Sequence, residues 1–130
     1  LVYRSMGAFI GAESVAAAEA AYCAGEQEKF WEYHDALFAH QGGENSGAFS
    51  NDHLIALADE LKLDVPTFTA CLSSGKYAAL VQKDAAAGQE AGVRGTPSFL
   101  IDGKLIEVGE YTGETQADEQ IQSTQEAHQL

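Results

Sequence analysis

Two cysteines are the side chains of this sequence best suited to covalent or metal chemistry. Cys23 and Cys71 lie far apart in the chain, and neither belongs to a Cys-X-X-Cys pair. With His34 and His40 they have the residue types of a zinc site, but their spacing matches no compact ligand pattern. We therefore expect no metal site and no cofactor. A disulfide and a pair of buried free thiols both remain open at this point.

The stretch from 93 to 103, Val-Arg-Gly-Thr-Pro-Ser-Phe-Leu-Ile-Asp-Gly, is the second feature with a chemical use. Residues 98–101 predict a short strand, and Asp102-Gly103 predicts a two-residue turn because glycine tolerates a positive φ. Residues 104–108 are then the return strand. Thr96-Pro97 precedes the first strand, where a proline removes no ladder donor. A cis bond before proline costs only about 0.5–1 kcal/mol, so cis and ordinary trans forms are both open.

Helices must position these two features. Apolar periodicity and capping residues predict helices over residues 13–24, 26–41, 50–62, 64–75 and 76–91, and a weak polar helix over 115–128. Residues 1–4 are β-prone and are expected to end a strand. Gly25 is expected to cap the first helix, and the aromatic stripe of the second is expected to pack in the core. His34, within that stripe, is expected to be a satisfied, half-buried histidine.

Length and charge limit the classes of function. A chain of 130 residues has room for one domain, or for a small domain with an insertion. The net charge of −13, with only 7 Lys and Arg, argues against nucleic acid or anionic lipid as a partner. No apolar run reaches the roughly 18 residues of a membrane helix. The chain begins at Leu1 and carries no signal peptide, so we expect a processed, cloned or truncated piece.

Three stretches resemble the DsbA-like thiol–disulfide oxidoreductases, which have a thioredoxin fold. Residues 93–99 resemble the cis-proline loop of that family, and residues 19–35 and 68–77 resemble its helical insertion. The resemblance covers roughly residues 1–108, and the tail from Gly109 departs from the family pattern. It implies an α/β, thioredoxin-like fold in which residues 1–10 and 92–130 form the thioredoxin-like part. Residues 11–91 would be the helical insertion.

The chemistry of that family needs a Cys-X-X-Cys pair at the start of a helix that follows a buried strand. The helix N-terminus lowers the thiol pKa, so that a thiolate can attack or leave. This sequence has no such pair, and residues 1–4 resemble the strand that follows the active-site helix. The N-terminal βα segment would then lie before Leu1. Its strand would be central, between residues 1–3 and 99–101, so we expect an incomplete sheet.

The resemblance also implies roles for residues that are present. Arg94, Gly95, Thr96 and Pro97 would form the substrate-binding loop, with a cis bond before the proline. Cys23 and Cys71 would form a structural disulfide, and closing a loop of this length stabilises by about 4 kcal/mol in the chain-entropy model. No catalytic residue lies in this chain. The implied partners are cysteine-containing proteins or peptides and a redox partner protein, in the bacterial periplasm or another extracytoplasmic space.

Two kinds of function therefore remain. The chain is part of a DsbA-like protein-disulfide oxidoreductase, or it is a non-catalytic thioredoxin-like peptide-binding module or an inactive truncation. A Cys-X-X-Cys pair upstream of Leu1 would separate the first from the others.

Overall fold

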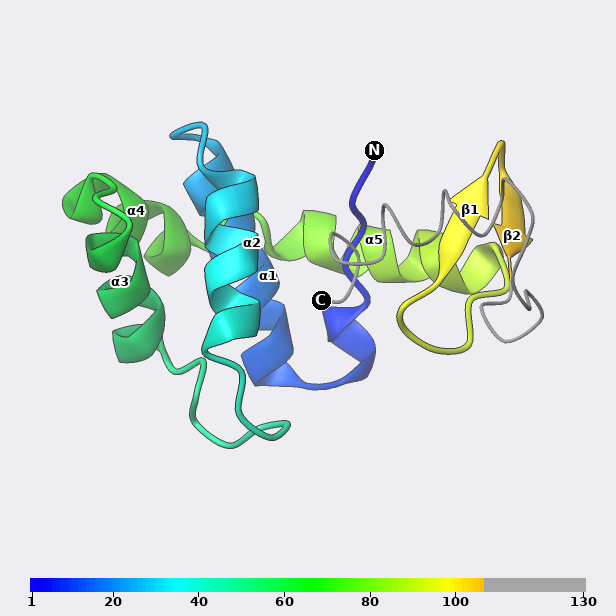
Figure 1. The fold of residues 1–130 in the computed structure, drawn as a ribbon, viewed down its shortest axis with the longest axis horizontal. Helices are drawn as coiled ribbons and strands as arrows, with labels where there is room; N and C mark the ends of the chain where they lie inside the picture. Colours follow the sequence, from blue (N-terminus) through cyan, green and yellow to red (C-terminus); the bar gives the residue numbers. More distant parts are fainter. Residues whose placement is uncertain (107–130) are drawn as a thin grey trace.

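Most of the chain folds into helices, and a short β-hairpin stands at one end of them (Figure 1). The computed structural model describes residues 1–106. In chain order the elements are the 3₁₀ helix η1 (Gly7–Phe9), α1 (Ala12–Gly25), α2 (Phe30–Ala39), α3 (Asn51–Glu60), α4 (Val65–Ser74), α5 (Ala78–Glu90), β1 (Phe99–Ile101) and β2 (Lys104–Ile106). The helix expected over residues 115–128 and the last two residues of the expected return strand lie outside this part.

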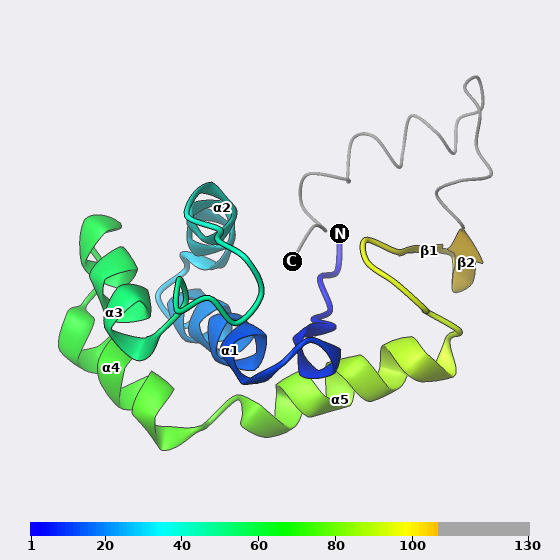
Figure 2. The ribbon, with the colours of Figure 1, turned by 90° about the horizontal axis from the view of Figure 1, so that it is seen from below.

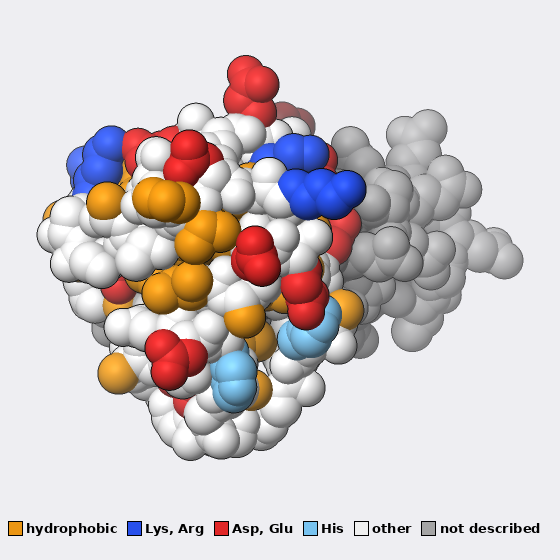
Figure 3. Space-filling view, turned by 90° about the vertical axis from the view of Figure 1, so that its left-hand side faces the viewer, with side chains coloured by type: hydrophobic (Ala, Val, Ile, Leu, Met, Phe, Trp, Pro, Cys, Tyr) orange, Lys and Arg blue, Asp and Glu red, His pale blue; other side chains and the backbone are white. Residues whose placement is uncertain are grey.

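Helix α5 connects two regions of the molecule. Helices α1 to α4 gather at its N-terminal end, and the hairpin lies near its C-terminal end (Figures 1 and 2). The N-terminal segment, residues 1–6, runs between these two regions (Figure 2). Figure 3 views the molecule from the α3 and α4 end, where Asp and Glu side chains are spread over the face, in keeping with the net charge of −13.

The hydrophobic core lies among α1, α2, α3 and α4. Helix α1 contributes small side chains, mostly alanine, so the neighbouring helices approach it closely. The largest core side chains are fully buried, among them Tyr33, Leu37, Leu54 and Phe68. The Tyr33 hydroxyl donates to the Leu54 carbonyl oxygen at 2.8 Å, and burial raises the pKa of this phenol. The helical region therefore has a core of its own.

Helices α3 and α4 begin where the capping residues predict. The Ser50 side chain accepts a hydrogen bond from the His53 N–H, and the Asp64 carboxylate accepts one from the Thr67 N–H. The second bond holds the pKa of Asp64 below its usual range. Gly75 follows α4 with a φ of 66°, the left-handed conformation that glycine adopts at little cost. These two predicted helix starts are confirmed.

The junction between α1 and α2 differs from the prediction. Helix α1 includes Gly25, which is not its cap, and α2 begins at Phe30 rather than at residue 26. Glu28 has a φ of 61°, which no residue inside a right-handed helix has. The Lys29 N–H donates back to the Ala24 carbonyl oxygen at 3.0 Å, so the chain turns between the helices. Helical periodicity alone does not reveal this turn.

The sheet is small, and the expected N-terminal strand is absent from the described residues. Strands β1 and β2 are antiparallel, with Leu100 opposite Leu105. Asp102 and Gly103 have φ values of 52° and 76°, as the predicted turn requires. Residues 1–6 form no strand, and within residues 1–106 β1 is paired only with β2. The prediction of a strand over residues 1–4 is therefore wrong for this structure, since a strand needs a neighbour for its N–H and C=O groups.

Asp84 holds the N-terminal segment in place instead. This α5 carboxylate is only 2% exposed and accepts hydrogen bonds from the Tyr22 hydroxyl and from the Ser5 N–H, the latter at 3.3 Å. The Arg4 guanidinium lies 3.3 Å from the same carboxylate. Burial, and then the bond to Asp84, raises the pKa of the Tyr22 phenol. One buried acid thus ties α1, α5 and the N-terminal segment together.

We expect Asp84→Ala to lower the free energy of unfolding by roughly 3 kcal/mol. The Ser5 N–H and the Tyr22 hydroxyl would lose their acceptor, and each buried donor left unpaired costs about 1–3 kcal/mol. Denaturant unfolding measures the change. Asp59→Ala is the matched control, because Asp59 is exposed in α3. Equal stability of the two variants would show that Asp84 does not anchor the segment.

Candidate functional site

The loop between α5 and β1 places the residues expected to contact substrate. Gly92, just after α5, has a φ of 88°, and the Val93 N–H donates to the Gly88 carbonyl oxygen at 2.9 Å. The Thr96–Pro97 peptide bond is cis, the form that the family resemblance implies. The Ser98 hydroxyl donates to the carbonyl oxygen of Gly95 and closes the turn.

Three of the four expected loop residues are open to solvent. Arg94, Gly95 and Thr96 are exposed, and Pro97 is half-buried. Exposed backbone groups beside a proline can pair with a peptide by main-chain hydrogen bonds.

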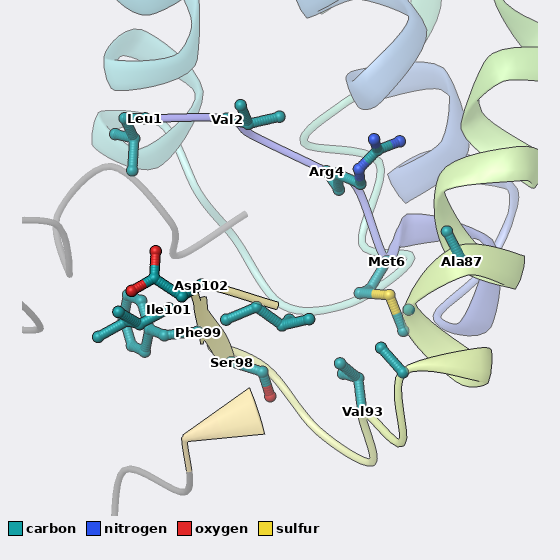
Figure 4. Close-up of a pocket in the computed structure, with 13 residues that line it drawn as sticks. Leu1, Val2, Arg4, Met6, Ala87, Val93, Ser98, Phe99, Ile101 and Asp102 are labelled. Atoms are coloured by element: carbon teal, nitrogen blue, oxygen red, sulfur yellow. The ribbon is translucent and has the colours of Figure 1, made fainter. Parts of the chain in front are cut away.

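An open cavity of about 640 Å³ lies between the N-terminal segment and the hairpin; we call it the groove (Figure 4). Leu1, Val2 and Arg4 line one side, and residues 98–102 line the other. Ala87 of α5 and Val93 lie at its edge (Figure 4). Leu1 is 69% exposed and Val2 is 72% exposed, so apolar side chains face this open space. The groove lies where the sequence analysis expects the central strand.

Small residues of α5 allow the N-terminal segment to approach the helix beside the groove. A Cβ atom on Gly88 would lie 2.5 Å from the Met6 Sδ atom, so a larger residue there requires Met6 to move. Ala87, Gly88 and Ala91 all line the groove. None of these three residues was predicted from the sequence, although small side chains at helical spacing indicate a close contact with a helix.

An aromatic cluster packs against the N-terminal segment from α2. The rings of Tyr3, Phe30, Trp31 and Phe38 lie within 6.1 Å of the His34 ring, measured between centroids. Burial raises the pKa of the Tyr3 phenol to about 12. The cluster joins α2 to the segment that lines the groove.

His34 was expected to be half-buried and fully hydrogen-bonded, and the structure differs on both points. Its side chain is fully buried, and its Nδ1 atom lies 3.1 Å from a carboxylate oxygen of Asp35. Its Nε2 atom has no hydrogen-bond partner among the described residues. The physical reason is tertiary, because Tyr3 of the N-terminal segment packs edge to face against the ring.

Cys23 of α1 and Cys71 of α4 form a disulfide, with their Cα atoms 5.9 Å apart. Cys23 is 2% exposed and Cys71 is 8% exposed, so neither sulfur is presented to a substrate. Both sulfurs are used by this bond, which removes them from the alternative zinc site with His34 and His40. Across residues 1–106 no group of three His, Cys, Asp or Glu side chains is placed to hold a metal ion. The bridge therefore staples two core helices.

Comparison with known proteins assigns this chain to a family. A family model described as thioredoxin matches residues 2–124, which is nearly the whole chain. The chain belongs to the thioredoxin family. A probable disulfide bond formation protein D of Bacillus anthracis is 31% identical over 102 residues, covering 75% of this chain and 46% of that protein. The likeness to disulfide-forming thioredoxin-fold proteins, first drawn from the sequence, is thereby confirmed at the family level.

Other relatives of this thioredoxin-family chain carry transporter names. A Na⁺/H⁺ antiporter NhaA 1 of Salinispora arenicola is 38% identical over 88 residues, and one of Herminiimonas arsenicoxydans is 35% identical over 99 residues. These matches cover 68% and 76% of this chain, but only 13% and 15% of the relatives. No solved structure matches. Among the described helices, none has the length and apolar character to span a membrane.

Proposed function

We propose that this chain supplies the substrate-binding loop and the helical scaffold of a DsbA-like protein-disulfide oxidoreductase. The redox-active Cys-X-X-Cys pair would lie on a βα segment upstream of Leu1. In this proposal residues 11–91 are the helical insertion, and residues 1–10 with 92–130 are an incomplete thioredoxin-like part. The groove is the observation that carries the proposal.

The shape and lining of the groove suit a β-strand. Its two sides are the N-terminal segment and β1, and Ala87 of α5 lies at its edge. A strand inserted there could pair with β1 and bury Val2 and Leu100, which are 72% and 46% exposed. Each fully exposed large aliphatic side chain gains about 1.5–3 kcal/mol on complete burial. The carboxyl end of such a strand would lead into the helix that carries the cysteine pair.

The proposed chemistry is thiol–disulfide exchange on a protein substrate. A substrate thiolate attacks one sulfur of the upstream disulfide, forms a mixed disulfide and releases the other upstream sulfur as a thiolate. A second substrate thiolate then attacks the substrate sulfur of the mixed disulfide. The substrate leaves oxidised, and two electrons remain on the reduced upstream pair. Arg94, Gly95, Thr96 and Pro97 hold the substrate backbone in the meantime, and a redox partner protein restores the upstream disulfide.

An extracytoplasmic site fits this chemistry. The Cys23–Cys71 bridge is of the kind that persists in oxidising compartments and is rare in the cytosol. The substrates would be secreted or periplasmic proteins that contain cysteine.

A second candidate function is supported by the transporter-named relatives. Because this chain matches only 13% to 15% of their length, a thioredoxin-like region can be one module of a much longer polypeptide. In that case the loop would bind a peptide segment of its own or another protein without redox chemistry. An upstream segment that lacks a Cys-X-X-Cys pair would favour this alternative.

The proposal predicts that the upstream segment fills the groove. In a longer polypeptide that includes this segment, the methyl groups of Leu1, Val2 and Leu100 should lose most of their solvent exposure. Paramagnetic relaxation of methyl signals by a soluble agent measures that exposure in both polypeptides. Ala56, exposed on α3, is the control and should not change. Groove methyls that stay as exposed as in the 130-residue chain would contradict the proposal.

A further inference from the structure

A second, smaller cavity lies beside the proposed substrate-binding loop, and we call it the side pocket. Its volume is about 180 Å³, and it lies between the N-terminal segment, the start of α1 and the loop of residues 41–49. Thr96 lines it directly. A peptide that lies along Thr96 would therefore lie beside the side pocket. Sites for drug-sized molecules span about 300–1,000 Å³, so this volume suits a single side chain.

Several hydrogen bonds fix the wall of the side pocket. The Glu13 carboxylate accepts hydrogen bonds from the N–H groups of Gly47 and Phe49, the first at 3.1 Å. His53 of α3 donates from Nδ1 to the Gly47 carbonyl oxygen at 2.8 Å. The loop is thus tied to both α1 and α3. A wall held in this way can discriminate between side chains, because little ordering is needed on binding.

The polar lining of the side pocket favours a positively charged side chain. Two acids, Glu13 and Glu44, line it together with Gln41 and Asn45, whose side-chain amides can each accept and donate hydrogen bonds. No Lys, Arg or His belongs to its described lining. Lys and Arg carry only donors and a full positive charge, so they match the two acids and can also donate to an amide oxygen. A substrate Glu or Asp there would face like charge without a counter-ion.

We propose that the side pocket is a specificity subsite for a Lys or Arg side chain of the substrate, close in sequence to the reactive cysteine. This inference rests on the proposed function, because it needs a peptide held by Thr96. In an extended peptide, successive side chains alternate in direction about every 3.3 Å, so one of those near the bound residue points into the pocket. Glu44, which is exposed, supplies the charge that a substrate meets first.

The test uses short peptides in which serine replaces the reactive cysteine, titrated into the 130-residue chain and followed by NMR. One series carries Lys at each position within two residues of the serine, and matched series carry norleucine or Glu. A further peptide has the Lys moved to its far end, which keeps the net charge. We expect the best Lys peptide to bind about fivefold more tightly than its norleucine and displaced-Lys counterparts. Its binding should shift the amide signals of Glu44, Asn45 and Thr96.

Variants then assign the preference to the side pocket. Glu44→Gln should remove most of the Lys preference and leave the norleucine peptide unaffected. Glu28→Gln, which neutralises an exposed acid outside the pocket, should leave the preference unchanged. Equal binding of Lys and norleucine peptides, with shifts at Thr96, would overturn the subsite and leave the proposed function standing. A Lys preference that survives Glu44→Gln would also overturn it, and no binding of any peptide would overturn both proposals.

Discussion

Oxidation of a dithiol peptide is expected from a polypeptide that includes the upstream segment, whereas the 130-residue chain should leave the peptide reduced. Exchange needs an exposed sulfur that can form a mixed disulfide and a second sulfur that resolves it. Within this chain the sulfurs of Cys23 and Cys71 are bonded to each other, and both residues are buried. The longer polypeptide should therefore oxidise the peptide well above the uncatalysed rate, and the 130-residue chain should not exceed that rate. It is measured as the loss of free thiols from the peptide over time.

Substitutions distinguish the two cysteine pairs in this assay. Serine in place of the first upstream cysteine should abolish oxidation in the longer polypeptide. Cys23→Ser with Cys71→Ser should leave the oxidation rate close to normal at a temperature where the variant stays folded. Turnover by the 130-residue chain that disappears with Cys23→Ser would mean that the buried pair is catalytic.

Loss of the Cys23–Cys71 bridge is expected to lower the free energy of unfolding by about 4 kcal/mol. The bridge joins residues 48 apart, and in the chain-entropy model a loop of this length restricts the unfolded chain by that amount. For a chain of 130 residues this corresponds to a fall in Tm of roughly 15 °C. Denaturant and thermal unfolding of Cys23→Ser with Cys71→Ser measure both quantities.

Chemical reduction is the matched comparison for that variant. The reduced native sequence should unfold at nearly the same denaturant concentration as the double serine variant, because both lack the cross-link. Cys71→Ser alone should behave similarly, with one buried thiol added. A double variant as stable as the oxidised protein would contradict the structural role of the bridge.

Local signals in the sequence predicted several features of the fold correctly. Ser50 and Asp64 mark helix starts because each side chain accepts a hydrogen bond from a nearby N–H group. Asp102-Gly103 marks the hairpin because its geometry demands positive φ values. Such features depend on neighbours within a few residues, so they form independently of the tertiary fold.

Features that depend on contacts between distant residues could not be predicted from the sequence. His34 is fully buried because Tyr3 packs over its ring, and no local pattern announces a contact between those two residues. Asp84 of α5 becomes the anchor of the N-terminal segment only because the fold brings Tyr22 of α1 and Ser5 of that segment to it. The same holds for the candidate site. The proline loop was visible in sequence, while the groove and the side pocket exist only between segments far apart in the chain.

The most direct test of the account is to find which cysteine holds the substrate during exchange. The longer polypeptide would carry serine in place of the second upstream cysteine, so that the mixed disulfide with a cysteine peptide is trapped. Mass spectrometry of non-reduced fragments then identifies the linked residue. We expect a link to the first cysteine of the upstream pair, with Cys23 still bonded to Cys71. A substrate linked to Cys23 or Cys71 would contradict it.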